Sequence, residues 1–196
     1  MPVSYNSTQL DALGELANIG SGTAATALSQ MVGTSVDLEV SAPVALPLAD
    51  AVDRAGVSDS VVTAVVVPLR GELAGMALIL LDPNAVNTLS ELLGVEAGTD
   101  IATSALGEIG NILCSSYLGA LATMTGLQVE PGPPQLIVDT LGAVLASALL
   151  EVGDIDETLH LESRLQIDGK HCALQFLLLP AGNGATEILS RIGLAS

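Results

Sequence analysis

The chain has 196 residues, of which 49% are hydrophobic, and its 22 acidic and 5 basic residues give a formal net charge of −17. This length and hydrophobic content suffice for a folded core and exclude a disordered chain. The negative charge argues against binding to nucleic acid or to membrane surfaces, because phosphate backbones and anionic lipids would be repelled.

Targeting and metal-binding signals are missing from the sequence. There is neither a signal peptide nor a run of about 20 apolar residues, so we expect a cytoplasmic protein. The two cysteines lack the spacing of a metal site, and we expect no bound metal. Plain solubility and adaptation to a salt-rich cytoplasm, where ions screen the repulsion, both remain open as explanations of the acidic surplus.

Helical and strand periodicities follow one another along the chain. In the first half we expect a helix at 7–32 that Gly20-Ser-Gly22 can break in two, a strand at 36–40, strands at 61–69 and 73–81 joined at Arg70-Gly71, and a helix from Pro83 to Leu93. In the second half we expect a helix at 101–125, a strand at 127–129, a helix near 141–150, strands at 158–167 and 171–179 joined at Asp168-Gly169, and a helix at 185–194. We predict an α/β (α+β) fold whose central antiparallel sheet of about six strands is packed with helices.

The order of elements recurs after residue 100, and so do the residues. The segment 11–19 matches 104–112 at an offset of 93, with six of the nine positions identical. We therefore predict one domain over residues 1–196, made of two half-repeats at about 7–95 and 100–196 that are related by pseudo-two-fold symmetry.

Each copy of the matching segment carries an acid and an amide on one predicted helical face. Glu15 and Asn18 in the first copy, and Glu108 and Asn111 in the second, lie three residues apart and thus one turn apart. A solvated face would explain one such pair. It explains two less well, because asparagine is a poor helix former and here occupies the same interior position twice.

Glycine stands beside the acid in both copies, at Gly14 and Gly107. Either the close approach of another molecule's backbone or close helix packing within the monomer would account for these glycines. The absence of a nearby nucleophile argues against covalent catalysis. A carboxamide can instead hold a water in line for phosphoryl transfer, with the metal and the electrophile supplied by a second molecule and the glutamate anchoring a cation of that molecule.

The two segments resemble the signature of the CheC/CheX/FliY family of chemotaxis phosphatases, which is Asp or Ser, three residues, Glu, two residues, Asn, about twenty-two residues, and Pro. The second copy fits this pattern completely, and the first copy departs from it only at the proline, which lies two residues beyond the expected position, Ser41. The matching residues are Asp11, Glu15, Asn18 and Pro43 in the first copy and Ser104, Glu108, Asn111 and Pro134 in the second. The resemblance spans essentially the whole chain and implies a CheC-like fold.

The resemblance implies a protein aspartyl-phosphate phosphatase that acts on a phosphorylated CheY-type response regulator. Glu15 and Glu108 would pair with the regulator's lysine, and Asn18 and Asn111 would orient the attacking water. Mg²⁺ would be held by the regulator, with no cofactor bound by this chain. The resemblance also implies a CheD-type receptor deamidase as a partner. The segment from Asp139 to Leu150, with Asp139, Leu141 and Gly142 at its start, would make the contact, and its apolar residues could equally be plain core.

A different class of function remains open on the sequence alone. The same faces would serve a non-catalytic adaptor that docks a response regulator, a motor-switch protein or a CheD-type deamidase. For the phosphatase we expect a monomeric or weakly associating protein. One lysine among so many acids also suggests archaeal motility in a salt-loving organism.

Overall fold

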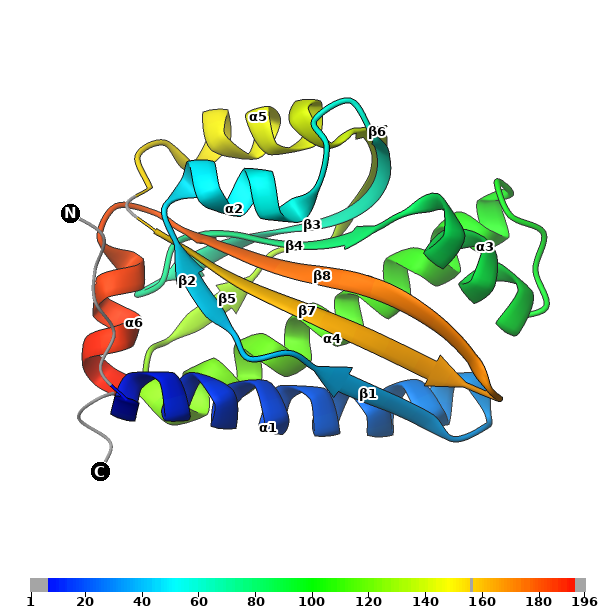
Figure 1. Cartoon of the computed structure of the whole chain (residues 1–196), viewed down its shortest axis with the longest axis horizontal. Helices are drawn as coiled ribbons and strands as arrows, with labels where there is room; N and C mark the ends of the chain where they lie inside the picture. The colour runs from blue at the N-terminus through cyan, green and yellow to red at the C-terminus, as the bar shows by residue number, and fades with distance from the viewer. Residues whose placement is uncertain (1–6, 156, 193–196) are drawn as a thin grey trace.

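The computed structural model describes residues 7–155 and 157–192, which form six helices and eight strands (Figure 1). The helices are α1 (Ser7–Val32), α2 (Leu48–Ala55), α3 (Pro83–Leu92), α4 (Asp100–Thr125), α5 (Leu141–Val152) and α6 (Gly184–Ile192). The strands are β1 (Val36–Val40), β2 (Val44–Leu46), β3 (Val61–Gly71), β4 (Gly75–Leu81), β5 (Val129–Pro131), β6 (Gln135–Thr140), β7 (Thr158–Ile167) and β8 (Lys170–Pro180).

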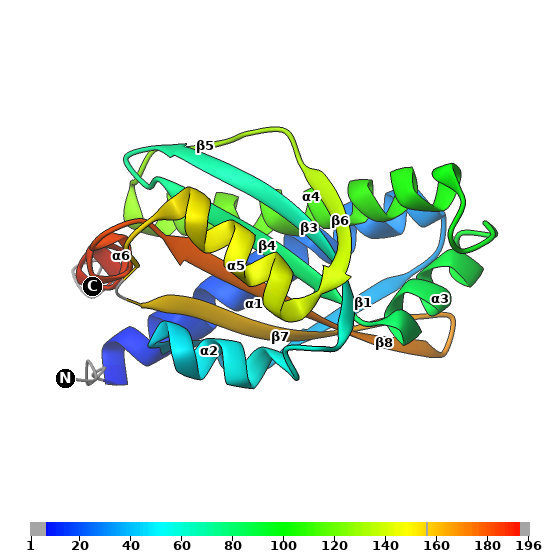
Figure 2. The same ribbon diagram turned by 90° about the horizontal axis from the view of Figure 1, so that it is seen from above.

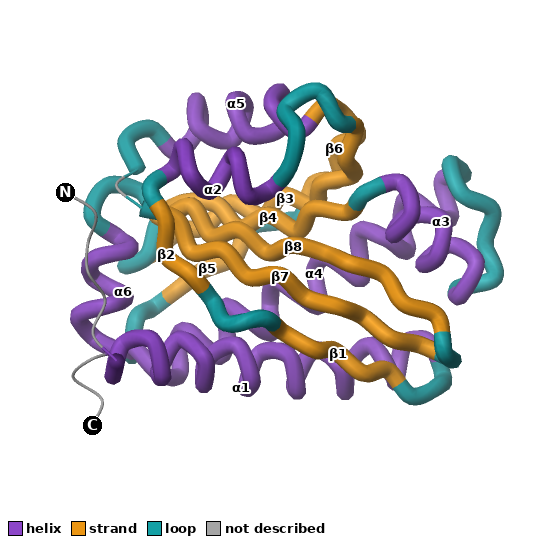
Figure 3. Tube along the Cα trace, viewed as in Figure 1, coloured by secondary structure: helices purple, strands orange, loops and turns teal. Residues whose placement is uncertain are grey.

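The strands make one curved, continuous antiparallel sheet, which Figure 3 shows between the helices. The order along the sheet is β1-β7-β8-β4-β3-β5, with β2 beside β7 and β6 beside β3. Each half of the chain thus lends its first strands to the hairpin of the other half, and the two hairpins meet where β4 pairs with β8. This arrangement confirms the predicted α/β class and its pseudo-two-fold design, with two short strands more than the six expected.

Helices cover the two faces of the sheet unequally (Figures 1 and 2). The long helices α1 and α4 run antiparallel across one face, and α2 and α5 lie over part of the other. The main core fills the space between the α1–α4 pair and the sheet, and a second core lies beneath α5. Tyr117 of α4 is central to the main core, where its ring lies 5.0 Å from that of Phe176 and its hydroxyl is 3.0 Å from the Ser163 hydroxyl.

The first helix is unbroken, so the expected break at Gly20-Ser-Gly22 is wrong. Gly20 instead lets α1 approach α4, because a methyl group at this position would overlap the Tyr117 ring. Gly20 is therefore needed for the close packing of two helices and not for a change in chain direction.

The two predicted hairpin turns had different outcomes. The turn at Asp168-Gly169 is confirmed, with φ values of 48° and 75° that suit a tight hairpin. The turn at Arg70-Gly71 is wrong, since β3 continues through Gly71 and the chain reverses at 72–74. The reason is β5 of the other half, which pairs with Arg70 and Gly71 and keeps them in the sheet, with Gly71 at a positive φ of 98°.

Three short elements were not expected, namely α2, β2 and β6. The other predicted helices and strands are present with boundaries shifted by a few residues, and the last two residues expected in the final helix lie outside the described part of the chain. Within residues 7–155 and 157–192, no helix is long and apolar enough to cross a bilayer.

Candidate functional site

The α1–α4 pair presents both predicted acid–amide pairs on its outer surface. The sheet-facing side of α1 buries small and apolar residues at a helical spacing, among them Leu13, Leu16 and Ala17. This burial turns Asp11, Glu15 and Asn18 outward, and all three are exposed. The first copy therefore has the geometry that its spacing predicted.

The second copy follows the same rule on α4. Leu106, Ile109 and Leu113 are buried, so Ser104 and Glu108 are exposed and Asn111 is half-buried. The helix begins just before this site, where the Thr99 hydroxyl accepts a hydrogen bond of 3.2 Å from the N–H of Ala102. Both asparagine amides can thus be reached from outside the molecule.

None of the four polar side chains has a partner inside the described part of the protein. Glu15 and Glu108 are outside the three ion pairs found in residues 7–155 and 157–192, and the amides of Asn18 and Asn111 form no hydrogen bond there. A carboxylate and a carboxamide left free on each helix retain their full capacity to bind another molecule.

The structure keeps the two pairs apart. Gly20 contacts Tyr117 where the helices cross, and each asparagine lies N-terminal to this point on its own antiparallel helix. Asn18 is two residues and Asn111 six residues from the crossing, which separates them by ~12 Å along the helix axis at ~1.5 Å per residue. The molecule therefore offers two separate sites, one on each helix, rather than one combined site.

The second site has a shallow hollow that sequence reasoning missed. It is lined by Asp100, Ile101, Ser104, Ala105 and Glu108. Ile101 is 68% exposed, which is unusual for a large apolar side chain. The sequence does show an isoleucine one turn before Ser104. Whether that side chain is exposed depends on how α4 packs, so the sequence alone could not predict the hollow.

A cysteine near this site is no alternative nucleophile. Cys114 follows Asn111 by one turn of α4 but is buried, and burial raises the pKa of its thiol to about 12. The thiol therefore stays protonated at neutral pH, and a thiolate is the form that attacks. The site is left with acid and amide chemistry.

The two motif prolines occupy different environments. Pro134 is exposed just before β6, whereas Pro43 is buried. Ser41 stands where the first copy departs from the family pattern, and its N–H and hydroxyl donate to the Glu162 carbonyl oxygen over 2.9 and 3.1 Å. A proline at 41 would lack that N–H, which gives a physical reason for the departure.

The segment expected to contact a deamidase lies on the side of the sheet away from α1 and α4. Asp139 is exposed and Gly142 is half-buried, with its N–H donating to the Ser58 carbonyl oxygen over 2.9 Å. Leu141 is fully buried in the core beneath α5. Its side chain is therefore part of that core, and the expectation that it contacts a partner directly is corrected.

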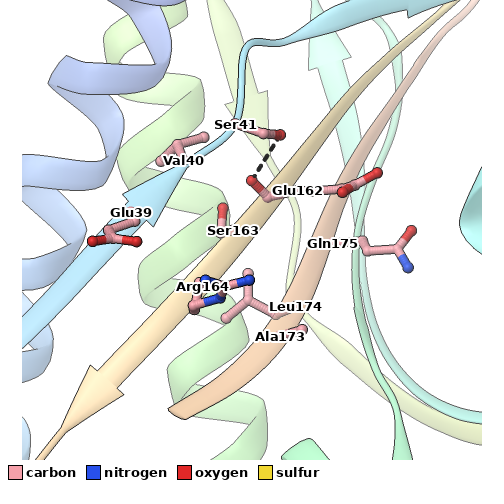
Figure 4. Close-up of a pocket in the computed structure, with 9 residues that line it drawn as sticks. All are labelled: Glu39, Val40, Ser41, Glu162, Ser163, Arg164, Ala173, Leu174 and Gln175. Carbon is pink, nitrogen blue, oxygen red and sulfur yellow. Dashed lines mark hydrogen bonds between the residues drawn. The ribbon is translucent and has the colours of Figure 1, made fainter.

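A separate hollow over β1, β7 and β8 contains none of the predicted site residues (Figure 4). Its lining residues are Glu39, Val40, Ser41, Glu162, Ser163, Arg164, Ala173, Leu174 and Gln175. Glu162 is engaged with Arg54 over 3.1 Å. Throughout the described ranges, no three His, Cys, Asp or Glu side chains come together as a metal site.

Comparison with known proteins finds one family in both halves of the chain. The CheC-like family matches residues 9–44 and 101–138, so each match contains one acid–amide pair. The CheY-P phosphatase CheC of Bacillus subtilis (strain 168) is 36% identical over 157 residues, which cover 76% of this chain and 75% of that protein. This chain belongs to the CheC-like family.

A second relative and a solved structure are also similar to this chain. The CheC1 protein of Halobacterium salinarum is 27% identical over 152 residues, covering 74% of this chain and 76% of that protein. The crystal structure of Thermotoga maritima FliY superposes with a TM-score of 0.76 at 19% identity over 100% of both chains. The fold is thus the one shared by CheC-like proteins and FliY, as the sequence motifs predicted.

Proposed function

We propose that this CheC-like protein is a phosphatase that hydrolyses the aspartyl phosphate of a CheY-type response regulator. The observation that carries the proposal is the free amide of Asn18 and of Asn111, each at the surface one turn from a free glutamate. The identity of 36% to a CheY-P phosphatase supports the choice of substrate.

In this proposal the chain supplies alignment rather than a nucleophile. The side chain of Asn18 or Asn111 accepts a hydrogen bond from a water and donates one toward the phosphoryl group, which holds that water in line with the phosphorus. The regulator's own carboxylates hold Mg²⁺, which neutralises charge on the phosphoryl oxygens. Ordering the water in advance removes part of the entropy cost of the attack.

Glu15 and Glu108 would anchor the regulator by pairing with its active-site lysine. Both carboxylates are exposed and unpaired among the described residues, so docking breaks no internal ion pair. An ion pair that the docked regulator partly shields from water stabilises the complex more than an ion pair on an open surface would. The glutamates would thus set where the regulator sits, and the asparagines would act on the water.

We further propose that a CheD-type deamidase binds on the opposite side of the molecule. Asp139 is exposed there, and Leu150 of α5 is 88% exposed. This surface lies across the sheet from α1 and α4 (Figure 1), so a deamidase and a regulator would bind without competing. We propose that the protein acts in the cytoplasm as a monomer, and the match to a Halobacterium relative supports a role in archaeal motility at high salt.

The proposed function is tested by turnover. Phosphorylated regulator and Mg²⁺ are mixed with this protein at a tenth of the regulator's concentration, and loss of the phosphoryl group is followed. An enzyme releases several phosphates per protein molecule, faster than spontaneous hydrolysis. Glu15→Gln with Glu108→Gln, which keeps side-chain size, should raise KM more than it lowers kcat.

The adaptor alternative makes the opposite prediction. A protein that only docks the regulator would bind it with the same pair of glutamates but leave the phosphoryl lifetime unchanged. Measured binding without any acceleration would therefore replace the phosphatase by the adaptor.

A further inference from the structure

Glycine lies four residues before each candidate asparagine, at Gly14 in α1 and Gly107 in α4. Both are inside long helices, where glycine costs stability relative to alanine. A glycine kept in such a place needs a physical reason, and the structure allows the usual reasons to be checked.

Neither usual reason applies to Gly14 and Gly107. Gly33 and Gly126 follow the ends of these helices with φ values of 74° and 71°, which favour glycine. Gly110 lies against Val65, where a methyl group would overlap the valine side chain. At Gly14 and Gly107 the backbone is helical, and a methyl group would meet no atom within 4 Å apart from the nearby backbone of its own helix. Close packing within the monomer, which the sequence left open, is therefore excluded for these two.

The repeat shows that this position differs from other open glycines in the same helices. Gly22 and Gly119 also have free space around them and are exposed, but the matching residues in the other copy are Ser115 and Thr26. A side chain is thus accepted at those positions in one copy. Among the helical glycines with free space, Gly14 and Gly107 are the pair that is glycine in both copies.

The direction of helical side chains connects these glycines to the amides. A side chain on an α-helix leans toward the N-terminus and covers the turn three to four residues before its own Cα. By this rule the Asn111 side chain leans toward the turn that contains Gly107, and that of Asn18 toward the turn that contains Gly14. The free space at each glycine thus lies one turn before the amide proposed to orient water, with no atom of that amide within 4 Å of the position that a Cβ would take.

We infer that Gly14 and Gly107 are positioning residues, which keep the space beside each asparagine amide open for the phosphorylated loop of the response regulator. The inference rests on the proposed function and deepens it. A methyl group in this space would hold the acyl phosphate away from the amide, while the neighbouring glutamate could still pair with the regulator's lysine.

The test compares two double variants. Gly14→Ala with Gly107→Ala adds methyl groups on the N-terminal side of each asparagine, toward which its side chain leans, and Gly22→Ala with Gly119→Ala adds them on the C-terminal side. Each alanine should raise the melting temperature by about 2–4 °C, because both pairs remove helical glycines. Only the first pair should lower kcat for phosphoryl loss, by about tenfold or more, since a misplacement of about 1 Å can cost about 100-fold.

The outcomes separate this inference from the proposed function. Wild-type turnover combined with unchanged kcat in Gly14→Ala with Gly107→Ala overturns the inference and leaves the phosphatase standing. An equal loss of kcat in the control pair also overturns it, because helix flexibility would then be the cause. A wild type that does not accelerate hydrolysis removes the proposed function and this inference together.

Discussion

Asn18 and Asn111 occupy matching positions, yet the first is exposed and the second half-buried. Helical periodicity was sufficient to predict that each shares a surface face with its glutamate, because buried leucines fix the opposite face. It could not predict the difference between the two, nor the hollow beside Glu108, since these depend on neighbouring elements. The candidate residues were thus predictable, and their detailed surroundings were not.

His160 of β7 is a second residue whose environment the sequence hides. It is 1% exposed, and its Nε2 is 2.9 Å from the Gln175 side-chain oxygen. The Gln175 amide in turn donates to the Ala55 carbonyl oxygen at the end of α2 over 3.0 Å. Its Nδ1 has no partner among the described residues. Adding a proton there would bury a charge with an unsatisfied donor.

This environment predicts acid sensitivity. Burial lowers the pKa of His160, and the Arg54 charge acts in the same direction, against the smaller raising effects of Gln175 and Glu162. The unfolded chain therefore takes up this proton at a higher pH than the native protein does. The resulting stability is complete above the ordinary histidine pKa of about 6.5 and is lost as the pH falls through the lowered native value.

The measurement is the melting temperature between pH 8 and pH 5 for the wild type and for His160→Gln. Glutamine cannot take up a proton, so its curve should fall less steeply below about pH 6.5. Subtracting the two curves removes the contribution of the carboxylates. Parallel curves would show that His160 does not titrate between the two states.

At the scale of elements, long periodic segments were predictable and short ones were not. α4 and β7 appear where their patterns indicate. α2, β2 and β6 have eight, three and six residues, and β6 follows a proline-rich connection, so few residues carry the pattern of each. Their positions depend on the strands they lie against: β2 is held by β7 and β6 by β3.

Partners from the other half also shifted predicted boundaries. Arg70-Gly71 reads locally as a turn, but β5 extends β3 through both residues. Gly20 reads as a helix break, but Tyr117 makes it a packing position. In both cases a contact between residues far apart in the sequence overrides the local conformational preference. Local sequence patterns cannot predict such a contact.

At the scale of the whole molecule, the exchange of β1, β2, β5 and β6 between the halves ties them into one sheet. This exchange supports the prediction of a single domain over residues 1–196, which stays a prediction. It also places the α1 and α4 sites on one side of the sheet and the α5 surface on the other (Figures 1 and 2). The repeat therefore gives two acid–amide sites on the α1–α4 side and leaves the α5 surface for another partner.

The charge of the whole molecule predicts a dependence on salt. The net charge is −17, and the three ion pairs of the described residues engage Arg54, Lys170 and Arg191. Most carboxylates thus repel one another, and salt reduces this repulsion because the Debye length falls from ~10 Å at 0.1 M to ~3 Å at 1 M. The melting temperature should rise between 0.1 M and 1 M KCl, and an unchanged value would remove the proposed adaptation to salt.

The central claim is that the amides of Asn18 and Asn111 orient the attacking water. The rate of phosphoryl loss from the regulator is therefore measured with Asn18→Ala plus Asn111→Ala, alongside binding of the same variant to the phosphorylated regulator. The account predicts hydrolysis at the spontaneous rate with binding largely retained, because the glutamates remain in place. Hydrolysis by the double variant at the wild-type rate would contradict it.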